Sequence, residues 1–311
     1  MEKISLGTTD VRITPLGVGA WSWGDRLFWN FGKGYDANDV RAAFETCLGA
    51  GIGFFDTAEA YGFGASEKLL GQSVRATKSD VIVATKFFPY PWRWRKVSLV
   101  HALRASLNRL GLVRVDLYQL HQPLPPVVIE TWMDALADAV ELRLTRAVGV
   151  SNCNAVQTRR AHAALAERGV PLASNQVKYS LLDRHIERDG TMQTCRELGV
   201  TIIAYSPMEM GLLTGKYTPA NLPPGVRGAR YRHEYIARAQ PVVGLLREIG
   251  QARGGKSPAQ VAINWTMRKD TVPIPGAKTA RQAQENVGAL GWQLSEGEMA
   301  ALDAASESAQ R

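Results

Sequence analysis

The sequence has few cysteines, no long apolar run and no block of like charge. Its three cysteines, Cys47, Cys153 and Cys195, lie far apart in 311 residues and form no CxxC pair. This spacing excludes a disulfide framework and indicates free thiols in a reducing compartment. The five histidines do not combine with these cysteines at ligand spacing, so we expect no metal site. No apolar run reaches the ~18 residues that a membrane span requires.

The first ten residues, MEKISLGTTD, also lack targeting features. They contain neither the apolar core of a signal peptide nor an Arg- and Ser-rich transit segment, so we expect a cytoplasmic protein with no membrane partner. The net charge of +8 could indicate a nucleic-acid partner. Because the positive charges are scattered, we favour a small anionic ligand and no nucleic acid. The oligomeric state stays open.

Short apolar segments alternate with helical ones along most of the chain. Residues 3–14 predict a small hairpin around a Gly-Thr-Thr-Asp turn. Buried parallel strands read as continuous apolar runs, and eight are predicted: 16–19, the segment ending at Asp56, 81–86, 115–121, 147–150, 173–176, 201–204 and 271–275. We therefore predict an α/β fold with a single (β/α)₈ TIM barrel, extra C-terminal helices and one domain over residues 1–311. The alternative, a doubly wound sheet, lacks its GxGxxG signature, because residues 17–22 read GVGAWS.

Helices are predicted between these strands from apolar residues at helical spacing. The predicted ranges are 36–50, 66–72, 98–110 with Ser98 as its cap, 126–140, 154–168, 183–198 and 257–267. Cys47 falls on the apolar face of the first, which favours a core position over a reactive one. Residues 206–238 show little periodicity and predict a long loop, which in a compact domain is typically functional or disordered. The basic residues of this loop are Lys216, Arg227, Arg230 and Arg232.

Polar or reactive side chains follow nearly every predicted strand. They are Trp21, Asp56, Lys86, His121, Ser151 with Asn152, Gln176, Tyr205 and residues 276–279. Each has an ordinary structural explanation when taken alone, such as a lysine at a solvated strand end. Their alignment on one rim is harder to explain in that way, because the carboxyl ends of barrel strands carry the active site.

Asp56, Tyr61, Lys86 and His121 form a chemically coherent set. Tyrosine, with a pKa of ~10, is a poor acid at neutral pH, and we expect a nearby ammonium to lower that pKa. A carboxylate can hold the buried ammonium, and a neutral histidine can donate a hydrogen bond to a carbonyl oxygen. The set is suited to proton delivery onto a carbonyl that receives a hydride. Since side chains cannot donate hydride, a nicotinamide cofactor is implied.

The chain resembles the aldo-keto reductase family through a series of segments in the family's order. They are FFDTAEAYG (54–62), VIVATKF (81–87), LYQLHQP (117–123), GVSN (149–152), NQVKYSLLDR (175–184), AYSPMEMGLLTGKY (204–217) and IPGAKTARQAQEN (274–286). The resemblance implies Tyr61 as general acid, tuned by Lys86 and Asp56, with His121 orienting the substrate carbonyl. The segment GAWSWGDRLFWNFGKGYD (19–36) is similar to a plant and cyanobacterial branch that includes pyridoxal reductase-like members.

The resemblance also implies NADPH, rather than NADH, as the cofactor. It places Ser151, Asn152 and Gln176 on the nicotinamide carboxamide, Tyr205 on the ring, and the 206–238 loop over the pyrophosphate. The full set of implied contacts is Gly19, Trp21, Asp56, Ser151, Asn152, Gln176, Tyr205, Ser206, Met208, Lys216, Gly276, Lys278, Thr279, Gln282, Glu285 and Asn286.

Apart from the resemblance, the pattern of residues 276–286 predicts the start of a helix. Thr279 and Gln282 form a T-x-x-Q capping box, and a helix N-terminus with Lys278 beside it suits an anion. The resemblance assigns Lys278, Thr279 and Gln282 to the adenosine 2′-phosphate, with Glu285 and Asn286 at the adenine. Many relatives carry an arginine where this chain has Gln282, although Arg281 lies next to it.

Aromatic residues gather after the first and third predicted strands: Trp21, Trp23, Trp29, Phe87, Phe88, Trp92 and Trp94. They predict an apolar pocket, with Trp21, Tyr61, Phe87 and His121 as substrate contacts. Pyridoxal, another aromatic or aliphatic aldehyde and a sugar-like carbonyl stay open as substrates. Glu59 has no assigned partner and is expected to be structural or solvent-facing.

Two other function classes stay open. The first is an NADPH-binding regulatory barrel of the potassium-channel β-subunit type, because that branch keeps the same four residues. The second, a basic nucleic-acid-binding barrel, has only the net charge in its favour.

Overall fold

A computed structural model describes residues 2–223, 228, 231 and 233–310. Eight parallel strands form one sheet, in which each strand pairs with the next one along the chain. The strands are β3 (Val18–Gly19), β4 (Phe54–Asp56), β5 (Ile82–Phe87), β6 (Val115–Leu120), β7 (Thr145–Ser151), β8 (Leu172–Lys178), β9 (Thr201–Tyr205) and β10 (Val272–Pro273).

The first and last strands of this sheet meet and close it. The backbone N–H groups of Gly17 and Gly19 donate to the carbonyl oxygens of Pro273 and Pro275, at 3.0 and 3.2 Å. The predicted (β/α)₈ barrel is therefore confirmed. The predicted N-terminal hairpin is also present, as β1 (Ile4–Ser5) and β2 (Arg12–Ile13) in antiparallel pairing.

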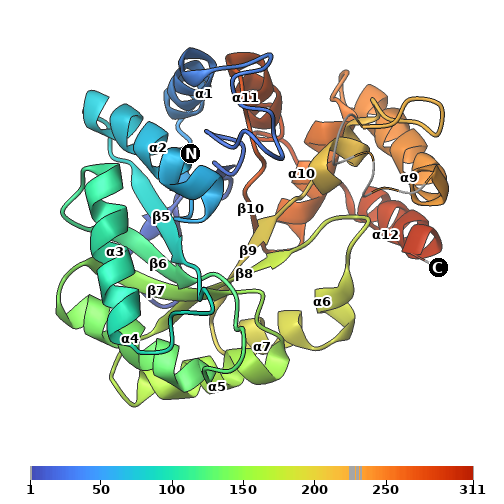
Figure 1. The fold of residues 1–311 in the computed structure, drawn as a ribbon. Coiled ribbons are helices and arrows are strands. Elements are labelled where there is room, and N and C mark those ends of the chain that lie inside the picture. The colour runs from blue at the N-terminus through green and yellow to red at the C-terminus, as the bar shows by residue number, and fades with distance from the viewer. Residues whose placement is uncertain (1, 224–227, 229–230, 232, 311) are drawn as a thin grey trace.

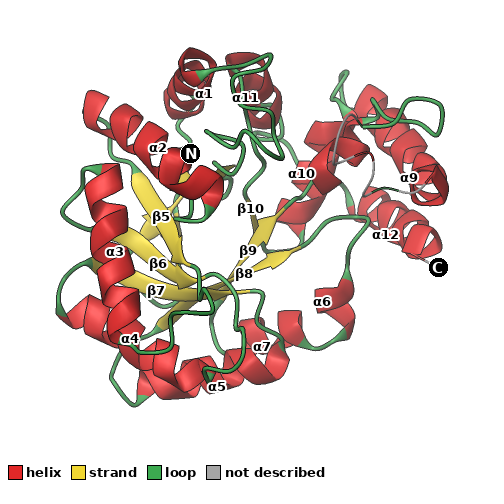
Figure 2. Cartoon of the chain, in the orientation of Figure 1, coloured by secondary structure: helices red, strands yellow, loops and turns green. Residues whose placement is uncertain are grey.

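Helices surround the strands (Figures 1 and 2). They are α1 (Ala37–Gly49), α2 (Ala65–Ala76), α3 (Val97–Leu110), α4 (Ile129–Glu141), α5 (Ala155–Ala166), α6 (His185–Arg188), α7 (Thr191–Glu197), α9 (His233–Ala252), α10 (Pro258–Arg268), α11 (Ala280–Val287) and α12 (Glu296–Gln310). Two short 3₁₀ segments, η1 (Tyr61–Gly64) and η2 (Glu209–Thr214), follow β4 and β9. None of the described helices is both long and apolar enough to cross a bilayer.

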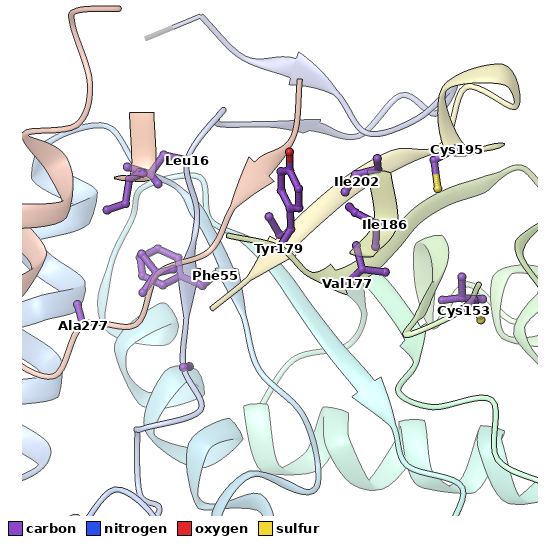
Figure 3. Close-up of a cluster of buried hydrophobic side chains, with 14 of the residues drawn as sticks. Leu16, Phe55, Cys153, Val177, Tyr179, Ile186, Cys195, Ile202 and Ala277 are labelled. Atoms are coloured by element: carbon purple, nitrogen blue, oxygen red, sulfur yellow. The ribbon is translucent and has the colours of Figure 1, made fainter. Parts of the chain in front are cut away.

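The apolar side chains form two layers, because successive residues of a strand point to opposite faces. Phe54 belongs to a cluster inside the barrel that the hairpin residues Leu6, Val11 and Ile13 join. The next residue, Phe55, belongs to the larger cluster between the strands and the helices. Figure 3 shows part of that outer cluster, with Val177 of β8, Ile186 of α6 and Ile202 of β9 close together. The interior of the barrel is therefore apolar up to the strand ends, where polar groups begin.

Local capping confirms several of the predicted helix starts. Asp36, Asn154 and Ser257 each accept from the backbone of the first turn and form complete capping boxes before α1, α5 and α10. Ser98 is not a cap, because α3 begins one residue earlier with Lys96 at its cap position.

Two predicted segments differ in type from the observed elements. The helix predicted over 183–198 is divided into α6 and α7, because Gly190 takes a left-handed backbone with φ of 81°. The loop predicted over 206–238 contains η2 and ends where α9 begins, at His233. The sequence does not predict η2 or the start of α9, because this part of the chain has little amphipathic periodicity.

Gly71 permits the close packing of α2 on α3 and gives a stability prediction. A Cβ at this position would lie 2.1 Å from the carbonyl oxygen of Leu110. Overpacking of this kind costs about 1–3 kcal/mol, so Gly71→Ala should lower the midpoint of urea unfolding. The matched control is Gly49→Ala in α1, where a Cβ would meet nothing within 4 Å. An unchanged midpoint for Gly71→Ala would contradict the packing described.

Candidate active site

A cavity of about 590 Å³ lies at the carboxyl ends of the strands. This volume is within the ~300–1,000 Å³ of small-molecule sites. Predicted site residues that line it are Gly19, Trp21, Asp56, Tyr61, His121, Ser151, Asn152, Gln176, Tyr205, Ser206, Met208, Lys216, Gly276, Lys278, Gln282, Glu285 and Asn286. The parallel strands therefore bring side chains from β3 to α11 around one cavity, as predicted from the residues that follow each strand.

Asp56 and Lys86 form a fully buried ion pair beneath the cavity. Lys86 is 0% exposed, and its Nζ donates to Asp56 Oδ2. The other two donors of this ammonium reach the Thr57 carbonyl oxygen at 2.8 Å and the Tyr61 hydroxyl at 3.3 Å. All three ammonium protons are thus in use, which is how a buried charge becomes tolerable. Burial, the largest single effect, lowers the pKa of Lys86, but the attraction and hydrogen bonds of Asp56 and Tyr61 together outweigh it, and the pKa lies above its usual value.

Two glutamines complete the hydrogen bonding of Asp56. Its second oxygen, Oδ1, accepts from Gln119 Nε2 at 3.0 Å and from Gln176 Nε2 at 2.8 Å. Gln176 also donates to Gln119 Oε1 at 3.3 Å. The carboxylate is therefore fixed by groups from β5, β6 and β8, which leaves it oriented toward Lys86.

Tyr61 is held over this pair by a tight turn. The three residues that follow Tyr61 are Gly62, Phe63 and Gly64, and they have φ of 54°, 54° and 86°. Left-handed backbone is costly for a residue with a side chain, yet Phe63 adopts it and leaves its ring 85% exposed. The turn directs the Tyr61 hydroxyl inward, where the Lys86 ammonium also lies 4.9 Å from the centre of its ring.

The pKa of Tyr61 differs from the sequence expectation. Burial raises this pKa, and the negative charge of Asp56 also raises it. Lys86 lowers it, as expected, but burial is the larger effect and the net pKa lies above 10. The expected lowering by Lys86 is therefore present but is outweighed by burial. Tyr61 keeps its proton at neutral pH and is ready to act as a donor.

His121 lies next to Tyr61 and is neutral. Its ring meets that of Tyr61 edge to face, with centroids 5.6 Å apart. Burial and the nearby Lys86 charge lower the pKa of His121 to about 3. Its Nδ1 is buried and has no hydrogen-bond partner among the described residues. Because His121 also lines the cavity, the site holds a neutral imidazole at its wall.

A chain of side chains links the ends of β7, β8 and β9. Ser151 Oγ donates to the Gln176 carbonyl oxygen at 2.8 Å, and Asn152 Nδ2 donates to the His121 carbonyl oxygen at 3.1 Å. The Tyr205 hydroxyl donates to Asn152 Oδ1 at 2.9 Å. Asn152 and Ser206, which directly follow β7 and β9, have left-handed backbones. Such strained residues gather at functional sites when their surroundings hold them in place.

The far end of the cavity is formed by the start of α11. Lys278, Arg281 and Gln282 line it together with Glu285 and Asn286. Thr279 is not part of this wall, because its Oγ1 caps α11 by accepting from the Gln282 N–H at 3.4 Å. The expected reciprocal bond is shifted by one residue, since Gln282 Oε1 accepts from the N–H of Lys278 at 2.8 Å. Thr279 therefore caps α11, and its predicted phosphate contact stays a prediction, because the cap uses the hydroxyl oxygen as an acceptor and does not use its O–H.

The aromatic wall is smaller than predicted. Trp21 and Trp29 line the cavity, whereas Trp23 is fully buried and donates through Nε1 to the Ala277 carbonyl oxygen at 2.7 Å. Trp92 and Trp94 are each 67% exposed and are not among the residues that line the cavity.

Phe87 is the clearest error among the predicted substrate contacts. It follows Lys86 in β5, so its side chain points to the other face of the sheet. There it is 0% exposed and its ring lies 4.8 Å from that of Trp132 in α4. Phe88, one residue later, is the ring that meets His121, with centroids 5.4 Å apart.

Glu59 has a structural partner that the sequence did not reveal. It is 8% exposed and pairs with Arg93, whose Nη1 and Nη2 both donate to its carboxylate. It also accepts from the N–H of Phe88 at 2.8 Å. The expectation of a structural residue is thus consistent with this position, where Glu59 ties the loop after β5 to the turn that carries Tyr61.

Several other cavity residues were not among the predicted contacts. They are Ser22, Trp29, Gln122, Pro207, Met210, Gly211, Thr214, Ala259, Ile274, Pro275 and Arg281. Most lie in loops, where spacing carries no signal. Arg227, Arg230 and Arg232 of the predicted basic loop lie outside the described residues.

Comparisons with known proteins agree with this geometry. The model of the Aldo/keto reductase family matches residues 15–307. A chloroplastic pyridoxal reductase of Arabidopsis thaliana is 41% identical over 98% of this chain and 86% of its own length. An aldo-keto reductase of Schizosaccharomyces pombe, named yakc [NADP(+)], is 34% identical over 79% of this chain and 76% of its own. The solved structure of a thermostable aldo-keto reductase bound to epalrestat superposes with a TM-score of 0.80 at 30% identity and covers 98% of this chain and 100% of that one.

The neutrality of His121 gives a direct pH prediction. Nitrogen NMR of histidine side chains should show His121 uncharged from pH 8 down to pH 5, because its pKa is about 3. His185 is the internal control, since its hydrogen bond to Asp183 raises its pKa above 6.5. Titration of His121 near 6.5 would contradict the burial described.

The same shift has a consequence for stability. Between about pH 6.5 and 3 the unfolded chain binds a proton at His121 that the folded chain does not. The contribution of His121 to the free energy of unfolding is therefore fully present above pH 6.5 and is lost progressively as the pH falls toward 3.

Proposed function

Because the chain belongs to the aldo/keto reductase family, we propose that it is an NADPH-dependent oxidoreductase that reduces aldehyde or ketone carbonyls to alcohols. One observation carries this proposal. The protonated Tyr61 hydroxyl lies 3.3 Å from the Lys86 ammonium at the wall of a cavity that His121 also lines. That arrangement is suited to give a proton to an oxygen that gains negative charge.

In the proposed reaction Tyr61 donates its hydroxyl proton to the carbonyl oxygen. The phenolate that forms is stabilised by Lys86, whose charge is kept in place by Asp56. Neutral His121 orients the carbonyl by hydrogen bonding. A charged imidazole would compete with Tyr61 as the proton donor, and the low pKa of His121 prevents this.

The residues around the cavity fit a nicotinamide cofactor. When bound, that cofactor supplies the hydride that side chains cannot provide. Ser151, Asn152 and Gln176 would hold the carboxamide and Tyr205 would stack on the ring, because amide and hydroxyl groups from three strand ends face the cavity there. Lys278 and Arg281 would hold the 2′-phosphate, since they place two positive charges at the start of α11. The S. pombe relative carries NADP(+) in its name.

The substrate end of the cavity favours a flat apolar carbonyl compound. Trp21 stacks on Phe28, with centroids 4.9 Å apart and planes at 17°, and its ring lies 6.1 Å from that of Tyr61. An aromatic aldehyde can pack against such rings while its carbonyl meets the Tyr61 hydroxyl. The Arabidopsis relative is named a pyridoxal reductase, which makes pyridoxal a first compound to test.

Replacement of the proposed proton donor tests the mechanism. Tyr61→Phe should lower kcat/KM for pyridoxal and benzaldehyde by about 10²-fold or more, because a general acid contributes that much. NADPH consumption at 340 nm measures the rate. The affinity for NADPH, followed by calorimetry, should change little, because only one hydroxyl is removed.

Tyr90→Phe is the matched control. Tyr90 stacks on Trp92 in the loop after β5 and is not among the residues that line the cavity. Its loss should leave kcat/KM unchanged. Full activity of Tyr61→Phe would refute the proposed mechanism. Tight NADPH binding by the wild type without turnover of any aldehyde would favour the regulatory barrel over the reductase.

A further inference from the structure

The Lys278 ammonium is held by the loop between β3 and α1, far away in the sequence. Its Nζ donates to the carbonyl oxygen of Trp29 at 3.2 Å and lies 4.7 Å from the centre of the Trp29 ring. The ring of Tyr35, later in the same loop, is 4.5 Å from the same nitrogen. Two aromatic faces and a carbonyl oxygen therefore fix the position of this cation.

The fold brings these segments together. Helix α1 follows the loop, α11 follows Lys278, and the two helices pack against each other, as Figure 1 shows. The loop is also ordered from within. Asp25 Oδ1 accepts from the N–H groups of Phe28 and Trp29 at 2.7 and 3.3 Å, and the Tyr35 hydroxyl donates to the Ser22 carbonyl oxygen at 2.6 Å.

Trp29 also touches the substrate end of the cavity. Its ring meets that of Trp21 edge to face, with centroids 5.4 Å apart and planes at 89°. It meets Phe28 in the same manner at 5.2 Å. Trp21 in turn lies beside Tyr61. One side chain thus contacts both the cation at the far end of the cavity and the ring that faces the proton donor.

We propose that Trp29 is a positioning residue that couples the phosphate end of the cavity to its substrate end. This inference rests on the proposed function, because it takes the 2′-phosphate of NADPH as the anion that Lys278 binds. An anion that pulls on Lys278 acts on the Trp29 ring and carbonyl, and through Trp29 on Trp21. NADPH and NADH would then shape the aldehyde pocket differently.

Coupling between two sites is reciprocal in binding free energy. If the two ends are coupled in this way, a change at Trp21 should alter the preference for the 2′-phosphate, although Trp21 lies at the other end. The preference is measured as the ratio R of the dissociation constants of NAD⁺ and NADP⁺. Any contact of Trp21 with the nicotinamide is common to both cofactors and cancels in R, so R reports only the 2′-phosphate.

The test is calorimetric titration of the folded variants with NAD⁺ and NADP⁺. Trp29→Leu should lower R about 5-fold, because a cation–aromatic contact and the link to Trp21 are lost together. Trp21→Leu should lower R about 2- to 3-fold in the same direction. Trp29→Phe, which keeps an aromatic face, should stay within about twofold of wild type. Trp94→Leu, an exposed tryptophan outside the cavity, is the control with unchanged R.

The outcomes separate this inference from the proposed function. If Lys278→Met leaves R unchanged, the 2′-phosphate assignment in the proposed function fails, and this inference fails with it. If Lys278→Met lowers R but Trp29→Leu does not, only the role of Trp29 is refuted. If Trp29→Leu lowers R and Trp21→Leu does not, Trp29 supports Lys278 alone and the coupling is refuted. A drop in R for both tryptophan variants supports it.

Discussion

The buried ion pair between Asp56 and Lys86 is the constraint on which the rest of the site depends. Two unit charges at 1% and 0% exposure are tolerable only when every donor and acceptor is used. Here two amides, one carbonyl and one phenol complete the set. The removal of either charge would leave the other buried and unpaired. This requirement explains why polar groups from several strands converge on one point above an apolar barrel interior.

The two ends of the cavity are built in different ways. The end that holds Tyr61 and His121 lies on strand ends and a tight turn, where backbone pairing fixes each side chain. The other end lies on the start of α11 and on the loop that carries Trp29, where aromatic contacts position Lys278. In the proposed function, chemistry at the first end needs fixed geometry, whereas cofactor entry requires a surface that loops can form. Trp29 contacts residues of both ends, Lys278 and Trp21, and in the proposed coupling it connects them.

The barrel and the side chains gathered at its rim could be predicted from sequence, because both follow from simple periodicity. Asp56, Lys86 and His121 each come at or just after the end of an apolar strand, and parallel strands carry those positions to one rim. Phe87 was misplaced because a shift of one residue along a strand reverses the face of the sheet. The capping role of Thr279 could also be predicted, since the spacing to Gln282 is that of a capping box.

Other features depend on distances that no sequence pattern encodes. Gln119 lies in β6 two residues before His121, which indicates only weakly that it faces the site, and its bond to Asp56 spans 63 residues. Glu59 pairs with Arg93 across a loop. The pKa of Tyr61 could not be predicted from its neighbours, because the depth of burial outweighs the charge of Lys86.

The measurement that tests the central claim most directly is the pKa of Tyr61 itself, with and without its ammonium partner. Carbon NMR of ring-labelled tyrosine resolves the hydroxyl-bearing carbon in wild type and in Lys86→Met, and the signal of Tyr90 reports that the fold is intact. The account predicts titration above pH 10 in wild type and a further rise in Lys86→Met, since the cation that stabilises the phenolate is gone. The same titration in both proteins would show that Lys86 does not act on Tyr61, and would contradict the account.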